Sequence, residues 1–175
     1  MIDIATAYNR YRFLGNEFLT WIWFCIENNP ALIQQCDPDL VSLDVGNRMV
    51  LENRLSNGIE TISIKGDAAG LEEALLSLKK GAMVTEMSLI YKSGVTQWFF
   101  GLKGESLGFS GLKLPETKTL ETEAEWEGLV LEKIYLYEKI FEFIQNLFRV
   151  FIKLRLSDHW GQDTLVGMKK WLQTT

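Results

Sequence analysis

The sequence is poor in the residues on which most enzymes and disulfide-rich proteins depend. Its 175 residues include one histidine, two cysteines and three prolines. Any histidine-dependent mechanism must use His159, and no Gly-x-Ser-x-Gly motif is present to hold a nucleophilic serine. Cys25 and Cys36 have no histidine nearby and match neither a zinc pattern nor a disulfide framework. We therefore expect no enzymatic activity, no cofactor, no metal, and two free thiols in a reducing cytoplasm.

The chain also lacks an apolar run long enough to cross a bilayer. The longest run, residues 18–26, is about half of the roughly 20 residues that a spanning helix needs. Its flanks carry Asn, Glu and Gln in place of the Lys and Arg of a peripheral anchor. No basic segment followed by an apolar one opens the chain, as it does in a signal peptide. We expect neither membrane binding nor secretion.

Positive charge is in the minority. There are 18 Lys and Arg against 23 Asp and Glu, which gives a net charge of −5. This balance excludes a uniformly basic surface, so any contact with nucleic acid requires a local patch. Hydrophobic residues make up 47% of the chain and aromatic residues 12%, a composition that excludes disorder and predicts one domain with a true core.

The most distinctive segment is an aromatic-rich block at residues 14–30. Asn16 offers a side-chain oxygen for an N-cap, and Pro30 stops the helix that this cap would start. The helix is apolar almost all round, which is typical of a core element. The preceding residues 5–13 mix Tyr, Phe, Asn and Arg, and their pattern fits either a short strand or an extended arm.

A period-two pattern follows, which predicts an antiparallel sheet of about five to six strands. Turn chemistry separates the segments at Gly46-Asn47, Asn57-Gly58 and Ser93-Gly94, while Gly81 closes a short helix. The predicted strands are residues 41–45, 47–51, 59–64, 83–91, 95–102 and 107–114, and the predicted helix lies between residues 71 and 78.

The remainder is predicted to be helical. Thr119 or Thr122 can cap a long helix that runs to about residue 156 and is apolar on most of its circumference beyond Ile134. Either the first helix covers its other side or a second copy of the chain does, which makes this helix a candidate homo-oligomer contact. The fold class is therefore a single α+β domain over residues 1–175, with the aromatic helix in 1–30, the sheet and short helix in 40–115, and the C-terminal helices in 119–175.

Three stretches of this arrangement resemble the RdgC family of bacterial recombination-associated proteins. They are residues 13–23 (FLGNEFLTWIW), residues 62–67, 71–75 and 79–84 (ISIKGD, LEEAL and KKGAMV), and residues 110–115 with 154–157 (SGLKLP and LRLS). The similarity covers nearly all of this chain and about the second half of the longer family members. None of the three stretches carries a catalytic residue.

The resemblance implies a nucleoid-associated protein that binds duplex DNA without sequence preference, forms a ring-shaped dimer and limits the access of the RecA recombinase. It favours Lys65, at a basic strand end, as a DNA contact. The paired cations Lys79 and Lys80 follow, as do Arg10 and Arg12. The family's lysine after the glycine of the third strand is Ala82 in this chain.

A second hypothesis is a protein interaction or scaffold module without DNA affinity, and a third is an enzyme that acts through His159. One geometric criterion separates the first two. A single concave face that holds Lys65, Lys79 and Lys80 favours DNA binding, whereas divergence of these lysines among carboxylates favours the scaffold.

Overall fold

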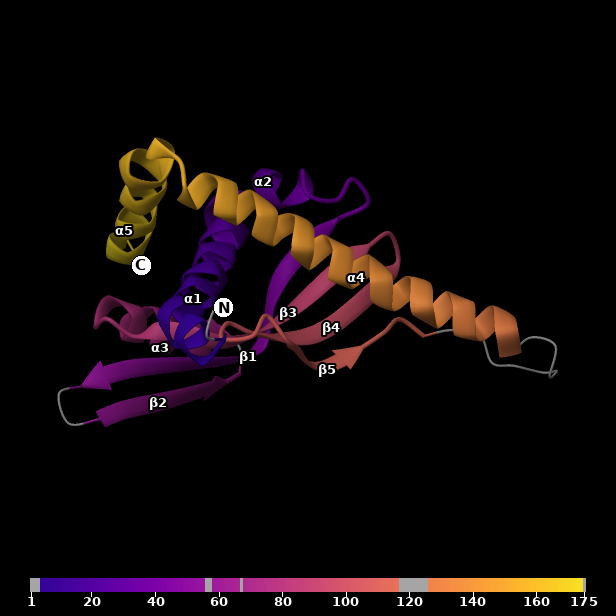
Figure 1. Ribbon diagram of the computed structural model, residues 1–175, viewed down its shortest axis with the longest axis horizontal. Coiled ribbons are helices and arrows are strands. Elements are labelled where there is room, and N and C mark those ends of the chain that lie inside the picture. Colours follow the sequence, from indigo (N-terminus) through magenta and orange to yellow (C-terminus); the bar gives the residue numbers. More distant parts are fainter. Residues whose placement is uncertain (1–3, 56–57, 67, 117–125, 175) are drawn as a thin grey trace.

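The computed structural model describes residues 4–55, 58–66, 68–116 and 126–174. Within these ranges the chain forms five α-helices and one sheet of five strands, which confirms the expected α+β fold (Figure 1). The helices are α1 (Ile4–Asn28), α2 (Pro30–Gln34), α3 (Ala68–Lys79), α4 (Trp126–Arg155) and α5 (Leu165–Thr174). The strands are β1 (Ser42–Leu55), β2 (Gly58–Lys65), β3 (Met83–Ser93), β4 (Thr96–Lys103) and β5 (Phe109–Lys113).

All neighbouring strands of the sheet are antiparallel, in the order β2-β1-β3-β4-β5. Strand β1 pairs with β2 on one side and with β3 on the other, and α3 carries the chain across it. The end of α3 is closed by Gly81, whose φ of 94° is the left-handed cap expected from the sequence. Gly94, with a φ of 58°, forms the expected turn between β3 and β4.

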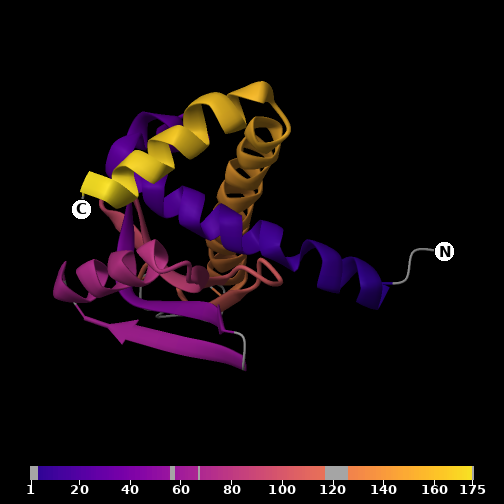
Figure 2. The same cartoon turned by 90° about the vertical axis from the view of Figure 1, so that its left-hand side faces the viewer.

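One face of the sheet carries the core. Helices α1, α4 and α5 lie on this side, as Figures 1 and 2 show from two directions. Phe18 and Trp21 of α1 pack on Phe151 of α4, with ring centroids 5.3 and 5.4 Å apart. Tyr91 of β3 packs on Phe143 of α4 at 4.9 Å. The aromatic block is thus a packing element, as its almost continuous apolar circumference predicted.

The start of α1 differs from the prediction. The helix begins at Ile4, so residues 5–13 are neither a strand nor an extended arm, and Asn16 lies in mid-helix and caps nothing. The helix continues without interruption past Gly15, whose backbone lies against Gly104. Asn16 is buried instead, and its Oδ1 has no hydrogen-bond partner. The expected stop is confirmed, because α1 ends at Asn28 and Pro30 begins α2.

The turn predicted at Gly46-Asn47 is also wrong. Strand β1 continues through these residues, and its register with β3 shifts between Val45 and Met49, which marks a bulge. A turn was expected because glycine and asparagine tolerate positive φ. The chain stays extended here although its regular pairing is interrupted, because the Gly66 amide donates to the carbonyl of Asn47 at 3.0 Å and Ser88 bonds the backbone of Arg48. The other predicted turn includes Asn57, which lies outside the described residues.

Helix α4 is one element of 30 residues, and its two halves have different surroundings. From Leu136 onward the helix lies over the sheet and α1, where the indole Nε1 of Trp98 donates to the carbonyl of Leu136 at 3.0 Å and Arg155 pairs with Glu17 at 2.8 Å. The first half extends past the sheet (Figure 1). The candidate capping residues Thr119 and Thr122 lie outside the described residues.

Helix α5 lies beside α1, and the carboxylate of Glu27 hydrogen-bonds both helices. After a π-helical segment, Trp160–Thr164, the helix starts at Leu165. Glu27 of α1 accepts the indole N–H of Trp23 at 2.6 Å and that of Trp171 at 2.7 Å. A single glutamate therefore joins the two helices through two tryptophans.

Candidate nucleic-acid interface

The second face of the sheet, called here the open face, has no helix of the described residues packed on it (Figures 1 and 2). Strand register decides which side chains it carries, because directly paired residues share a face. Met49 pairs with Ile64 and with Met87, and all three are buried on the core face. Their neighbours Arg48 and Lys65, which also pair with each other, therefore lie on the open face.

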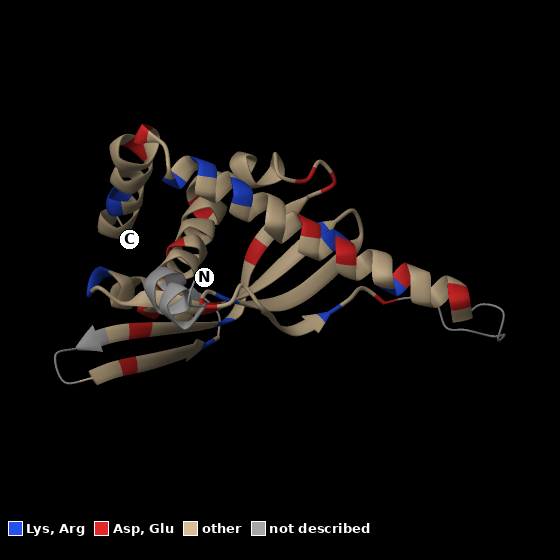
Figure 3. Cartoon of the chain, in the orientation of Figure 1, with Lys and Arg blue, Asp and Glu red and all other residues tan. Residues whose placement is uncertain are grey.

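The open face is richer in positive than in negative charge. Its described side chains include the cations Arg48, Lys65, Lys92, Lys103 and Lys113 and the carboxylates Asp44, Glu52 and Glu86. Five cations against three carboxylates leave an excess of two positive charges, on a chain whose net charge is −5. The negative charge is thus concentrated elsewhere, including the first half of α4 (Figure 3). This asymmetry makes the open face the part of the sheet best suited to an anionic ligand.

Two of the three carboxylates are already engaged. Lys92 pairs with Asp44 at 2.8 Å, and Arg48 lies 3.7 Å from Glu86. Glu86 also accepts a hydrogen bond from Ser110 at 2.9 Å. Within the described part of the chain, the lysines without an ion-pair partner on this face are Lys65, Lys103 and Lys113.

These three lysines do not have equal surroundings. Lys103 borders a hollow that also contains the side chains of Glu52, Glu86 and Glu105, so nearby carboxylates offset its field. Lys65 stands directly opposite Arg48 on neighbouring strands. The basic part of the open face therefore extends from Lys65 and Arg48 on β2 and β1 to Lys113 on β5.

A hollow of about 570 Å³ lies within this basic part, and we call it the basic hollow. Arg48 and Lys113 are among its lining residues, and small residues leave its centre open. A Cβ on Gly46 would lie 2.7 Å from Ser88 Oγ, and one on Gly101 would lie 2.3 Å from Ser110 Oγ.

The bulge in β1 shapes one edge of the basic hollow. Ser88 Oγ accepts a hydrogen bond from the amide of Arg48 and donates one to its carbonyl, both at 2.8 Å. One hydroxyl thus replaces the strand pairing that the bulge interrupts. The Arg48 backbone is held in place, although the side chain of Arg48 is about half exposed.

The floor of the basic hollow includes an aromatic ring. Phe99 of β4 is 42% exposed and pairs with Lys113 on one side and with Ile90 on the other. Phe99 is the one phenylalanine, tyrosine or tryptophan at an outward position of these strands among the described residues. An exposed ring between basic side chains is the arrangement that single-stranded nucleic-acid sites use.

The predicted basic residues do not gather on one face. Lys65 lies on the open face, but Lys79 and Lys80 lie at the far end of α3, whose 12 residues span about 18 Å. Arg10 and Arg12 lie in the early turns of α1, and their side chains are outside those described. Lys65, Lys79 and Lys80 therefore do not share one face, and by the criterion given above their divergence counts toward the scaffold hypothesis. The cations that accompany Lys65 on the open face are different ones.

Sequence reasoning missed Arg48 and Lys113 for an identifiable reason. Each is an isolated cation in its strand, so no local cluster of charge indicates it. The alternation of side chains along a strand could have indicated them, and it assigns Lys113 to the outward face. For Arg48 this argument failed, because a turn was predicted at Gly46, just before it in the sequence.

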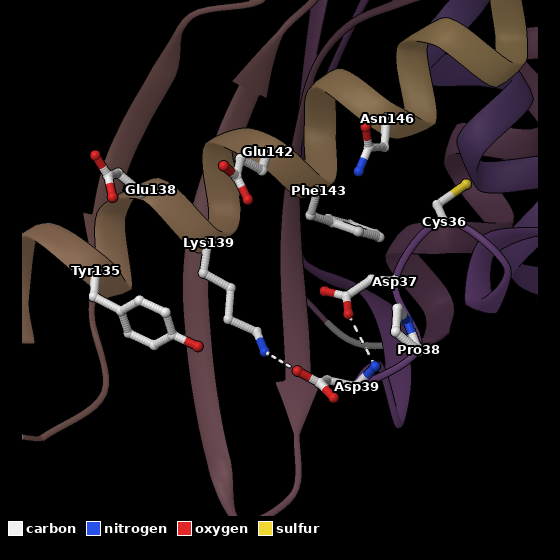
Figure 4. Close-up of a pocket in the computed structure, with 10 residues that line it drawn as sticks. All are labelled: Cys36, Asp37, Pro38, Asp39, Tyr135, Glu138, Lys139, Glu142, Phe143 and Asn146. Carbon is white, nitrogen blue, oxygen red and sulfur yellow. Dashed lines mark hydrogen bonds and ion pairs between the residues drawn. The ribbon is translucent and has the colours of Figure 1, made fainter.

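A second hollow, of about 360 Å³, lies between α4 and the loop that follows α2 (Figure 4). Its carboxylates are Asp37, Asp39, Glu138 and Glu142, with Lys139 as the one cation of its lining. Lys139 bonds Asp39 at 2.8 Å, and the hydroxyl of Tyr91 donates to Asp37 at 2.5 Å.

The charges of this second hollow determine what it can bind. Burial alone would lower the pKa of Lys139, but the hydrogen bond with Asp39 and the charges of Asp37 and Asp39 raise it overall. Lys139 therefore stays charged, and its ion pair with Asp39 holds the loop that follows α2. With four carboxylates around it, the hollow repels phosphate, and in the described part of the chain no group of three metal-ligating side chains is found.

His159 has a partner that the sequence did not indicate. Its Nδ1 lies 2.8 Å from Asp163, one helical turn further on, whereas the adjacent Asp158 is not the partner. Both side chains are about 70% exposed, and no nucleophile is recorded in contact with the ring. This geometry is that of a surface contact between two side chains one helical turn apart.

Comparison of the chain with protein-family models, with curated proteins and with solved structures found no match. None of the described helices has the length and apolar character needed to cross a membrane. The functional argument therefore depends on the chemistry of the open face.

Proposed function

We propose that the chain binds duplex DNA without sequence preference, through phosphate contacts on the open face. The observation that carries this proposal is the excess of positive charge there, five cations against three carboxylates, on an acidic chain. Phosphate contacts by Lys and Arg are largely independent of sequence. The resemblance to the RdgC family extends the proposal to a nucleoid-associated homodimer in the cytoplasm that limits the access of RecA to DNA.

The lysines without ion-pair partners are the proposed phosphate contacts. Lys65 and Lys113 can bind phosphate without first breaking an ion pair, and Arg48 is held only loosely by Glu86 at 3.7 Å. The strand order places β2 and β5 four strand spacings apart, or roughly 19 Å. Such a span fits a duplex that lies across the strands and touches the sheet along its backbone.

The test is a fluorescence anisotropy titration with two duplexes of unrelated sequence, at about 50 and about 200 mM salt. We expect equal affinities for the two sequences and a log–log salt slope of roughly −0.9 for each phosphate contact. Lys65→Gln and Lys113→Gln should each weaken binding to both sequences and reduce the slope by about one unit.

The matched control is the double variant Lys79→Gln, Lys80→Gln, which removes two exposed lysines at the far end of α3. It should leave the affinity and the slope unchanged. A wild-type chain that binds no duplex at low salt would contradict the proposal. A control variant that loses as much affinity as the open-face variants would contradict the assignment of the surface.

A second candidate function, a protein interaction or scaffold module, is favoured by the exposed half of α4. Val130, Ile134, Tyr137 and Phe141, called here the α4 seam, follow one another at spacings of four, three and four residues and are 42% to 50% exposed. This is the a/d spacing of helices that pack side by side. Phe141, at the sheet end of the seam, also packs edge-on against Phe109 of β5 at 4.5 Å. We propose that a second copy of the chain covers the α4 seam, whether or not DNA is bound.

Sedimentation at several concentrations tests this assembly. Ile134→Glu places a charge in the α4 seam and should shift a dimer to a monomer, whereas Lys133→Glu, on the neighbouring exposed position, should not. A wild-type chain that remains a monomer would contradict the seam as an interface. A stable oligomer whose behaviour is unchanged by added DNA would favour the scaffold over the DNA-binding protein.

A further inference from the structure

Duplex binding uses the charge of the open face but gives no role to the apolar floor of the basic hollow. In a duplex the faces of the bases are stacked inside, and phosphates form the outer surface. Phe99 and Ile90 would then face backbone and solvent without a complementary group. Their position between Arg48 and Lys113 indicates a ligand that has both a flat apolar part and negative charges.

We infer that the basic hollow accepts an unpaired base of single-stranded DNA, stacked on the ring of Phe99, with the flanking phosphates bound by Arg48 and Lys113. The inference rests on the proposed function, because it assigns an additional ligand state to the same surface. Every base has a π-face, so stacking adds affinity without sequence preference.

The geometry of the strands supports this assignment. Lys113 pairs directly with Phe99, which places their Cβ atoms about 5 Å apart on the same face. Arg48 lies on the other side of the basic hollow, three strand spacings away, or roughly 14 Å. The row that starts at Lys113 continues through Phe99 and Ile90 to Asp44, and Arg48 lies one row further along β1, beside Ser88. A strand that crosses the basic hollow obliquely from β5 to Arg48 thus passes a cation, the exposed ring, Ile90 and a second cation.

The small residues of the basic hollow leave room for the base. Ser110 Oγ occupies the space beside Gly101, because a Cβ there would lie 2.3 Å from it. Ser88 and Ser110 are turned to backbone and to Glu86, respectively. The hydroxyls are therefore occupied and do not select one base by hydrogen bonding. The volume of about 570 Å³ is within the range of small-ligand sites.

The experiment compares single-stranded and duplex DNA of the same length on the same variants. Phe99→Ala removes the ring, and Phe99→Leu keeps an apolar side chain without a π-face. Each should weaken single-strand binding by about 5- to 150-fold, the range expected for the loss of one stacked base. Duplex affinity should change less than twofold, and Phe99→Tyr should restore single-strand binding.

A fluorescent base analogue within the single strand supplies a spectroscopic reading. Stacking on Phe99 should quench 2-aminopurine in the wild-type complex, and the quenching should be lost with Phe99→Leu. The control Tyr135→Ala removes an aromatic ring of similar exposure on α4 and should change neither reading. Thermal unfolding of each variant verifies that the sheet is intact.

The outcomes separate this inference from the proposed function. Loss of single-strand affinity and quenching, with duplex affinity kept, supports the stacking site. The stacking site is overturned if single-strand binding does not change when Phe99 is replaced. If duplex binding still depends on Lys65 in that case, the proposed function stands. Equal losses for both DNA forms also overturn the stacking site. A wild-type chain that binds neither form overturns both.

Discussion

Gly15 of α1 and Gly104, just after β4, meet backbone to backbone: a Cβ on Gly15 would lie 1.7 Å from the carbonyl oxygen of Gly104. The contact is tight from both sides, because a Cβ on Gly104 would lie 2.4 Å from Asn16 Oδ1. Gly104 also donates its amide to the carbonyl of Thr85 at 2.8 Å, so it cannot retreat without breaking a bond to β3. These two glycines fix the height of α1 above the sheet.

Gly15→Ala should therefore destabilise the protein although alanine is the better helix former. The helix propensity of alanine would add about 1 kcal/mol of stability. The clash of the new Cβ with the Gly104 backbone forces α1 and Gly104 apart and outweighs that gain. We expect a net loss of at least about 1 to 3 kcal/mol in the free energy of unfolding. Urea denaturation measures the difference. The control is Gly128→Ala in α4, where a Cβ meets nothing within 4 Å and a gain of up to about 1 kcal/mol is expected. Equal effects at the two positions would contradict the contact.

Tyr91→Phe should lower the free energy of unfolding at neutral pH. It should also make that free energy fall less steeply as the pH rises into the alkaline range. The buried hydroxyl of Tyr91 donates to Asp37 at 2.5 Å, and its loss should cost about 1 to 3 kcal/mol. Burial, with the hydrogen bond to Asp37, raises the pKa of Tyr91 above its usual value near 10. Because the folded-state pKa is the higher one, this contribution is complete below about pH 10 and is lost as pH rises through the raised pKa.

The measurement is the free energy of unfolding of wild type and Tyr91→Phe at pH 7 and at several values above 10. The two curves should approach each other at high pH. Tyr135→Phe, at an exposed tyrosine of α4, serves as the control and should stay within about 0.5 kcal/mol of wild type. Parallel curves for Tyr91→Phe and wild type would contradict the raised pKa.

The two thiols should differ in reactivity. Burial, with a smaller contribution from Cys36, raises the pKa of the Cys25 thiol to about 12, and its side chain is 1% exposed. Burial, and then the charge of Asp37, also raises the pKa of Cys36, but this residue is only partly buried. The thiolate is the reactive form, so at pH 8 Cys25 should react only as fast as the protein unfolds.

An aromatic disulfide reagent applied to Cys36→Ser and to Cys25→Ala tests this order. The first variant, which retains Cys25, should react much more slowly than the second when folded, and both should react rapidly in urea. Stability linked to Cys25 should be present below about pH 9 and lost as pH rises toward about 12. Rapid reaction of Cys25 in the folded protein would contradict its burial.

Glu27→Gln should loosen α5. The carboxylate uses one oxygen for Trp23 and the other for Trp171. Glutamine has only one acceptor oxygen, so one indole N–H loses its partner, at a cost of about 1 to 2 kcal/mol. Tryptophan emission should shift to longer wavelength, and α5 should become more sensitive to proteolysis. Glu132→Gln, at an exposed carboxylate of α4, should change neither property.

Local chemistry predicted the features that a single residue decides. Gly81 and Gly94 take positive φ values, which is a backbone property of glycine, and both turns lie where expected. Helix α1 begins at Ile4 and runs through Asn16, which is packed against Gly104, so the capping preference of Asn16 gave the wrong boundary. Propensity is a weak guide where tertiary contact decides.

The same distinction explains the candidate interface. Lys65 was predicted from the resemblance to the RdgC family, in which it matches a basic strand end. Arg48 was missed because the bulge at Gly46 changes which residues of β1 face outward, and that bulge is visible only in the pairing with β3. Lys79 and Lys80 were further candidate contacts, and the length of α3 separates them from Lys65 in space.

Helix α4 has a consequence for geometry beyond its own packing. The spacing of the α4 seam continues without interruption through Ile144 and Phe148 to Phe151, which are wholly or partly buried. One rotational phase therefore governs both halves of the helix. A single inserted residue between them would turn the seam by about 100° relative to the sheet. The packing of Phe151 on Phe18 fixes the rotation of α4 about its own axis. The same rotation sets the direction in which the α4 seam points beyond the sheet.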